Sequence, residues 1–385
     1  MFRLHSLRLT NFRGFESLEL PFERDLTVLV GINGSGKSSV LSAVVRTFRA
    51  LSDDRRVVAA DIRSGAEEAT IELVADLDSG NAVQWNLSSR LGEAAMAVEG
   101  ARPSPPHLLL MYGTNRAATD STPGSTPGES WMPVHAEESW FDAGASYARF
   151  FIWFREMEDL ENEALRDGQE APAQLTAVRE AVERALEVSN LRVRRRFEPY
   201  SQKPILTVDK AGVELPFDSL SEGERALVAL VADIARRLSL RDPARGLGGD
   251  AVVLIDEIEL HLHPALQRVI LSRLRAVFPK VQWITTTHSP VVASELEGRH
   301  LRVLEGFALR EVGHGRGREI DAILREVFDT AARPAAIEER FEHLVVALDE
   351  ARLDEARTLL EELEASIGND SDLVYYRAIL ERLAS

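Results

Sequence analysis

The chain has 385 residues, of which 45% are hydrophobic and 28% charged, and it contains no cysteine. This length suits one large α/β domain with insertions, or two domains. The lack of cysteine excludes disulfides, cysteine-ligated zinc and thiol catalysis. Neither a signal-peptide core nor an apolar run of membrane-spanning length occurs in the sequence, so we expect a soluble cytoplasmic protein without a membrane partner.

The net charge of −17 is unevenly distributed. Residues 319–385 contain seventeen acidic and seven basic residues, so most of the negative excess lies near the C-terminus. The clearest basic patch is formed by Arg192, Arg194, Arg195 and Arg196. Nucleic-acid binding at this arginine patch is one hypothesis, and an extended, solvated basic strand explains it equally well.

One short stretch carries the strongest chemical signal. Residues 31–38 match the pattern G-x-x-x-x-G-K-[ST], after the apolar run 26–30 and before a helical segment at 38–51. The N–H groups of a glycine-rich loop can wrap a phosphate, and the helix N-terminus adds partial positive charge. Lys37 can reach the β- and γ-phosphates, and the Ser38 hydroxyl can ligate Mg²⁺. ATP and Mg²⁺ are therefore the expected cofactors.

Hydrophobic patterning predicts the elements around this loop. Alternation or continuous apolar character indicates strands at residues 3–10, 16–20, 26–30, 69–77, 82–88 and 108–112. Residues 117–147 are rich in Pro, Gly, Ser and Thr and predict an irregular insertion. Apolar residues at heptad spacing then predict two antiparallel helices at about 149–190.

The second half of the chain begins with a capped helix. Residues 219–240 have an apolar helical face, with Ser221 as the predicted N-cap and Glu224 completing a capping box. The apolar run 251–255 then predicts a strand that ends in two carboxylates. Asp256 is expected in the Mg²⁺ shell, and Glu257 is expected to polarise the attacking water.

Histidines follow these carboxylates. A predicted strand at 281–287 ends at His288, which can bond the γ-phosphate or its attacking water, or can have structural partners only. His261 and His263 have the spacing of two metal ligands on an extended segment. With no third ligand nearby in the sequence, a structural role is favoured for this pair.

Five motifs occur in a fixed order: Asn11-Phe-Arg-Gly-Phe15, the phosphate loop, Leu220-Ser-Glu-Gly-Glu224, Leu254-Ile-Asp-Glu257 and Thr286-Thr-His-Ser-Pro290. In combination they resemble the ABC-type ATPase heads of the RecF, SMC and overcoming-lysogenization families. The resemblance covers about residues 1–310. It implies an α/β fold with a mixed sheet, a short helical-hairpin insertion and, over 319–385, an acidic helical tail.

The resemblance also implies site residues. The nucleotide-binding residues are then Arg13, Asn33, Gly34, Ser35, Gly36, Lys37, Ser38, Ser39, Ser221 and Gly223, with Ser38 and Asp256 at the metal. Ser221 and Gly223 look like the signature that caps ATP on the opposite protomer, which implies an ATP-dependent head-to-head homodimer or a higher assembly. Glu257 looks like the catalytic base and His288 like the switch histidine. Asn115 stands where such ATPases usually place a glutamine.

Further stretches resemble the PtuA-type ATPases of Septu and retron-associated anti-phage systems. They are Tyr112-Gly-Thr-Asn-Arg116, Trp153-Phe-Arg-Glu156, Asp233-Ile-Ala-Arg-Arg237 and Glu259-Leu-His-Leu-His-Pro264; Leu266 departs from the tryptophan expected at its position. This resemblance implies an ATP-gated dimer that senses a signal and regulates a partner nuclease. The alternatives are a RecF- or SMC-like DNA-repair ATPase and, less favoured, a transporter nucleotide-binding subunit.

The acidic tail bears on the partner. No nuclease motif is visible in the sequence, so the nuclease is expected on another chain, most simply one of the HNH type. Apolar residues of the tail are predicted to share one face of each helix: Phe341, Leu344, Val345, Leu348, Leu353, Ala356, Leu360, Leu363, Val374, Ile379 and Leu383. These helices either pack on the ATPase head or dock a basic partner, and the acidity of their opposite faces favours docking.

Overall fold

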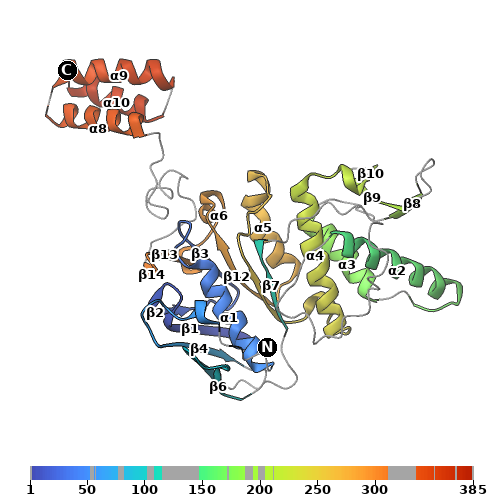
Figure 1. Cartoon of the computed structure of the whole chain (residues 1–385). Helices are drawn as coiled ribbons and strands as arrows, with labels where there is room; N and C mark the ends of the chain where they lie inside the picture. The colour runs from blue at the N-terminus through green and yellow to red at the C-terminus, as the bar shows by residue number, and fades with distance from the viewer. Residues whose placement is uncertain are drawn as a thin grey trace. The chain divides into compact units, whose positions relative to one another are not determined.

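The computed structural model describes residues 2–52, 56, 58–76, 82–101, 108–114, 147–170, 173–186, 194–197, 204–210, 212–310, 335–350, 352–368 and 371–383. The chain divides into two compact units, Met1–Arg318 and Glu319–Ser385. We call them the head and the tail unit and describe each by itself (Figure 1). None of the described helices combines the length and apolar character that crossing a membrane requires.

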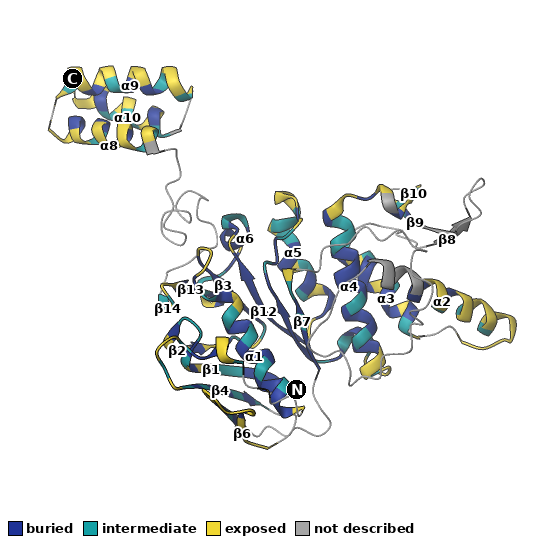
Figure 2. Ribbon diagram, viewed as in Figure 1, coloured by how far each residue is buried: buried dark blue, intermediate teal, exposed yellow. Residues whose placement is uncertain are grey.

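A six-stranded sheet forms the centre of the head, in the order β14-β13-β3-β12-β11-β7. Its strands are β3 (Leu26–Val30), β7 (Leu109–Tyr112), β11 (Ala251–Ile255), β12 (Val281–Thr287), β13 (Leu301–Glu305) and β14 (Ala308–Arg310). All neighbouring pairs are parallel except β13 and β14. Every residue of β3, β11 and β12 is buried, because both faces of the sheet are covered (Figure 2).

A second, antiparallel sheet has the order β2-β1-β4-β5-β6. Its strands are β1 (Arg3–Phe12), β2 (Phe15–Pro21), β4 (Glu68–Asp76), β5 (Ala82–Arg90) and β6 (Ala97–Glu99). Helix α1 (Lys37–Leu51) packs between the two sheets. One buried cluster joins Leu7 and Leu73 of the antiparallel sheet, Val44 of α1, and Val252 and Ile284 of the parallel sheet. Burial of this apolar surface holds the phosphate loop between two layers.

Helices cover the other side of the parallel sheet. They are α2 (Tyr147–Arg166), α3 (Ala173–Leu186), α4 (Glu222–Arg241), α5 (Pro264–Val277) and the short α6 (Pro290–Ser294). Helix α3 packs against α4 and α5 (Figure 1). Between α3 and α4 the chain forms a small antiparallel sheet of β8 (Arg194–Phe197), β9 (Pro204–Lys210) and β10 (Val213–Pro216). Single 3₁₀ turns lie at Ala59–Asp61, Phe217–Ser219, Gly246–Gly248 and Gly298–His300.

The tail unit contains α8 (Ala335–Asp349), α9 (Leu353–Ile367) and α10 (Ser371–Leu383). Its buried cluster is apolar throughout: Phe341, Leu344, Ala347, Leu348, Ala356, Leu360, Leu363, Leu373 and Leu380. The predicted buried face of α10 is wrong at Val374 and Leu383, which are 59% and 50% exposed, whereas Ile379 packs against the cluster as predicted. Leu373 and Leu380 are the fully buried residues of α10.

These elements confirm the predicted fold class: an α/β head with a mixed sheet and phosphate loop, a two-helix insertion and a helical C-terminal region.

Candidate active site

The phosphate loop lies between β3 and α1, at the carboxyl end of the parallel sheet. Gly34 and Gly36 have φ angles of +82° and +99°, a region that favours glycine. A Cβ on Gly36 would lie 2.4 Å from the Phe15 ring, and one on Gly31 would lie 2.3 Å from the Leu304 carbonyl oxygen. Gly36 is the N-cap of α1 and brings no side chain to the first-turn N–H groups, which suits them to bind an anion.

Lys37 is buried inside this loop. Its ammonium donates to the carbonyl oxygens of Gly31 (2.7 Å) and Ile32 (2.9 Å). Burial lowers the pKa of Lys37, and the nearby carboxylates of Asp256, Glu259 and Glu257 act in the opposite direction. An unpaired ammonium would be costly in such a place. A bound phosphate can supply the anionic partner that the carbonyl oxygens only partly replace.

Ser38 and Asp256 come together at the end of β11. The Ser38 hydroxyl donates to Asp256 Oδ1 at 3.1 Å, and the Thr286 hydroxyl donates to the same oxygen at 2.6 Å. Hard oxygen donors of this kind suit Mg²⁺, which keeps several waters and takes few ligands from the protein. The donor set therefore fits the predicted role of Ser38 and Asp256, and a bound Mg²⁺ would there neutralise charge that develops on the phosphates.

Glu257 occupies an unusual backbone conformation. Its φ angle is +51°, which is rare for a residue with a Cβ, and its N–H donates to Thr286 Oγ1 at 2.7 Å. The N–H of Ile258 donates to the Thr286 carbonyl oxygen at 3.0 Å. Two bonds to the end of β12 thus hold the Glu257 turn in a costly conformation, an arrangement typical of functional sites. Its carboxylate remains about 30% exposed.

His288 follows β12 and faces two carboxylates. Its Nδ1 lies 3.2 Å from Glu259 Oε1 and 3.9 Å from Glu257 Oε1. The sequence predicted His288 and Glu257 as site residues but gave Glu259 no role there. Glu259 lies two residues after Glu257, in a run of carboxylates at a strand end, and this position could have indicated it as a site residue.

Arg13 lies beside the phosphate-loop helix, and its contact with nucleotide stays a prediction. It has a φ of +51°, donates from Nε to Asp61 Oδ1 at 2.9 Å, and its Nη1 lies 3.5 Å from Ser39 Oγ. Asp61 also pairs with Arg46 at 2.8 Å. Asp61 therefore positions Arg13, a role that no motif in the sequence indicates.

Ser221 and Gly223 belong to a different part of the head. Ser221 caps α4, since its hydroxyl accepts from the Glu224 N–H at 3.3 Å and Glu224 Oε2 accepts from the Ser221 N–H at 3.0 Å. This confirms the predicted capping box. In Figure 1, strands β7 and β12 and helix α5 lie between α4 and α1. Helix α4, whose first turn carries the signature residues, is thus separated from α1 in this view.

The His261 segment lies against the start of α4. A Cβ on Gly223 would lie 2.8 Å from the His261 carbonyl oxygen, so a larger residue would push α4 away. His261 Nδ1 lies 2.9 Å from Glu222 Oε1, and His263 accepts at Nδ1 from the Ala265 N–H as the N-cap of α5. These contacts give both histidines structural partners.

Several predicted residues have no side-chain description. Arg192 and Asn115 lie outside the described residues. Arg194, Arg195 and Arg196 form most of β8, which pairs with β9, but only their backbone is described. The arginine patch and the role of Asn115 therefore stay predictions.

Two family models match the chain. One is described as "AAA ATPase domain" and matches residues 2–76, and the other as "AAA domain, putative AbiEii toxin, Type IV TA system" and matches residues 116–294. The first spans the phosphate loop and the second spans the strand with Asp256 and Glu257. Both models describe AAA domains, and the one over the phosphate loop describes an ATPase, in agreement with the site geometry.

The chain is also similar to named proteins and to a solved structure. The chain is 28% identical to the "Retron Ec83 probable ATPase" of Escherichia coli, over 86% of this chain and 77% of that protein. It is 20% identical to the "Septu protein PtuA" of Bacillus thuringiensis, over 98% of this chain and 92% of that protein. The solved SMC head domain from Thermotoga maritima matches with a TM-score of 0.49 and 16% identity, covering 80% of this chain and 99% of that chain.

The phosphate loop, the site geometry and the two family models together define the chain as a P-loop ATPase. Its predicted resemblance to the PtuA-type and retron-associated ATPases is confirmed.

Proposed function

We propose that the chain is an ATP-gated switch that acts as a head-to-head dimer and regulates a partner nuclease in cytoplasmic anti-phage defence. The carrying observation is the convergence of Lys37, Ser38, Asp256, Glu257 and His288 at the carboxyl end of β3, β11 and β12. This is the constellation that phosphoryl transfer to water uses. The names of the retron and Septu relatives support the defence setting.

In this proposal the loop N–H groups and Lys37 bind the β- and γ-phosphates. The Glu257 carboxylate accepts a proton from the water that attacks the γ-phosphate, and His288 bonds that phosphate or water. Ser221 and Gly223 close the site of the opposite protomer, because α4 is separated from α1 of its own chain in Figure 1. ATP then joins two heads, and hydrolysis releases them.

Glu257→Gln tests the chemical part. The variant should bind ATP and remain dimeric with ATP and Mg²⁺, while turnover falls by roughly 10²-fold or more because the general base is lost. Sedimentation in saturating ATP–Mg²⁺ measures the assembly. A monomeric variant would contradict the ATP-joined dimer.

A mixing experiment tests the shared site. Lys37→Ala chains lack phosphate binding, and Ser221→Arg chains block the site of the opposite protomer, so either variant alone should be inactive. A mixed dimer regains one complete site, formed by the phosphate loop of the Ser221→Arg chain and the signature of the Lys37→Ala chain. Hydrolysis should return on mixing, and a mixture as inactive as its components argues against a site shared between chains.

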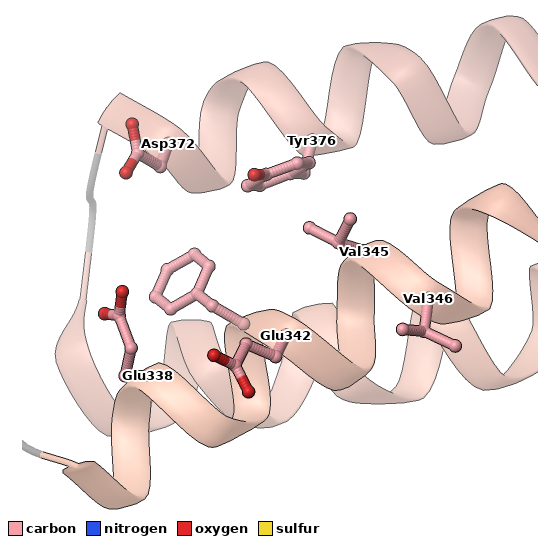
Figure 3. A pocket seen from close by; sticks show the side chains of 7 residues that line it. Glu338, Glu342, Val345, Val346, Asp372 and Tyr376 are labelled. Carbon is pink, nitrogen blue, oxygen red and sulfur yellow. The ribbon is translucent and has the colours of Figure 1, made fainter.

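A groove on the tail unit supports the partner part of the proposal. It lies between α8 and α10, has a volume of about 440 Å³, and is lined by Glu338, Phe341, Glu342, Val345, Val346, Asp372 and Tyr376. Figure 3 shows the carboxylates of Glu338, Glu342 and Asp372 toward one end and Val345 and Val346 toward the other. This pattern suits a segment with an apolar anchor and flanking Lys or Arg, and we assign it to an HNH-type nuclease.

Neutralisation of the groove tests this assignment. We expect Glu338→Gln, Glu342→Gln and Asp372→Asn together to abolish co-purification with a co-expressed HNH-type nuclease from the same gene neighbourhood. A matched control neutralises three exposed carboxylates outside the groove, Glu361, Glu362 and Glu381, with the same change in net charge. Equal loss in both variants would leave only general acidity as the cause, and a neighbourhood without a nuclease would remove this part of the proposal.

A further inference from the structure

Glu259 is a buried carboxylate with three partners on one segment. Its side chain is 7% exposed. Oε2 accepts from the Thr287 hydroxyl at 2.7 Å, and Oε1 accepts from the His288 backbone N–H at 2.7 Å. The same Oε1 lies 3.2 Å from His288 Nδ1. Glu259 thus contacts the side chain of Thr287, the last residue of β12, and both the backbone and the ring of His288, the residue after it.

The ring nitrogen of His288 stands between two carboxylates. Nδ1 can donate a single hydrogen, and Glu259 lies closer to it (3.2 Å) than Glu257 does (3.9 Å). When Glu259 accepts that hydrogen, His288 does not donate it to Glu257. When Glu259 is missing, the same hydrogen can be donated to Glu257 after a small ring movement.

We infer that Glu259 is a positioning residue for ATP hydrolysis, which holds the His288 imidazole and keeps it off the general base Glu257. The inference rests on the proposed function, because it gives Glu259 its role through that hydrolytic site. A bonded carboxylate that fixes an imidazole ring is a general device for setting its orientation and its tautomer. The Glu257–Glu259 turn and the His288 turn are then coupled across two strands.

The inference predicts different turnover for two substitutions of Glu259. In Glu259→Ala, turnover should fall by roughly 10- to 10²-fold, the range that loss of a positioned group produces. Affinity for ATP should stay within about threefold, since Glu259 makes none of the phosphate contacts. Glu259→Gln should recover most of the turnover, because its carbonyl oxygen can accept from His288 while its amide donates to Thr287 Oγ1.

A double-mutant cycle separates positioning from plain structural support. In a His288→Ala background Glu259 has no imidazole to hold, so Glu259→Ala should cost little further turnover. Structural damage would instead multiply the two losses. ATP affinity is measured by equilibrium titration, turnover by phosphate release, and folding by thermal unfolding of each variant.

The outcomes are distinct. Wild-type turnover in Glu259→Ala, or multiplied losses in the double variant, overturns the inference and leaves the proposed function intact. Absence of hydrolysis in the wild type, or full activity in Glu257→Gln, contradicts the proposed function itself. If Glu259→Ala does not fold, the cycle is run with Glu259→Gln, whose smaller loss of about threefold should disappear in the His288→Ala background.

Discussion

The head and the tail unit use their polar residues in opposite ways. The head buries hydrogen-bonded polar groups such as Gln282, Asp256, Glu259 and Thr287. Among the described residues of the tail unit, every buried residue is apolar. The head therefore depends on particular atoms at particular places, whereas the tail unit depends on apolar volume and helical phase.

The largest expected effect follows from removing the Lys37 ammonium group in the head. Lys37→Ala should weaken the affinity for ATP by roughly 10²-fold or more, because the charge that meets the β- and γ-phosphates is lost. Its fold should survive, since the variant also removes a buried ammonium. Titration with ATP checks binding, and Lys280→Ala, at an exposed lysine, is the control. Retained binding would contradict the assignment of the loop.

The tail unit offers the opposite case. Leu344 is fully buried in its three-helix cluster, and Leu344→Ala should destabilise the unit by about 3 kcal/mol. Small domains have stabilities of about 3–5 kcal/mol, so the tail unit should be largely unfolded. The head should still bind ATP with unchanged affinity. Limited proteolysis and ATP titration on the same sample check both statements, and a loss of ATP binding would show that the units are not independent.

The same contrast explains what the sequence could predict. The phosphate loop, the strand before it and the pair Asp256–Glu257 were predictable, because phosphate chemistry demands these residue types at fixed spacing along one segment. The contact of Glu259 with His288 joins residues 29 positions apart, and Asp61 meets Arg13 across 48 positions. Such contacts depend on the register between strands and on loop geometry, which local patterns do not contain. The buried face of α10 was predicted wrongly at two positions for another reason. Its apolar residues allow more than one stripe, and only packing against α8 and α9 selects among them.

An intermediate effect is expected at a polar cluster that ties α4 to β7. Asp233 accepts from the Tyr112 hydroxyl at 2.9 Å, from Arg236 at 3.0 Å and from Arg237 at 2.7 Å. Burial alone would raise the pKa of Asp233, but the two arginines outweigh it and the pKa is lowered. Asp233→Asn removes this charge and should destabilise the head by about 2 kcal/mol at neutral pH.

The pH dependence of this cluster has a definite sign. A depressed carboxyl pKa contributes stability that is present above the ordinary value near 4 and is lost as pH falls through the lower folded value. Urea unfolding of the wild type and of Asp233→Asn should therefore give stabilities that differ at pH 7 and approach each other below about pH 4. A difference that stays constant with pH would exclude the ionised carboxylate as its cause.

The smallest effect separates a local from a shared role at one hydroxyl. Ser221→Ala removes the N-cap of α4 and half of its capping box, which should lower the stability of the head by about 1 kcal/mol without nucleotide. Ser221→Thr keeps the capping oxygen and should restore that stability.

If Ser221 also closes the ATP site of the opposite protomer, Ser221→Ala should in addition lose part of the stabilisation that ATP–Mg²⁺ gives to the wild type. Thermal unfolding with and without ATP–Mg²⁺ measures both effects. The control is Ser219→Ala, whose hydroxyl donates to the Pro216 carbonyl oxygen. An unchanged ATP-induced shift in Ser221→Ala would confine Ser221 to its capping role.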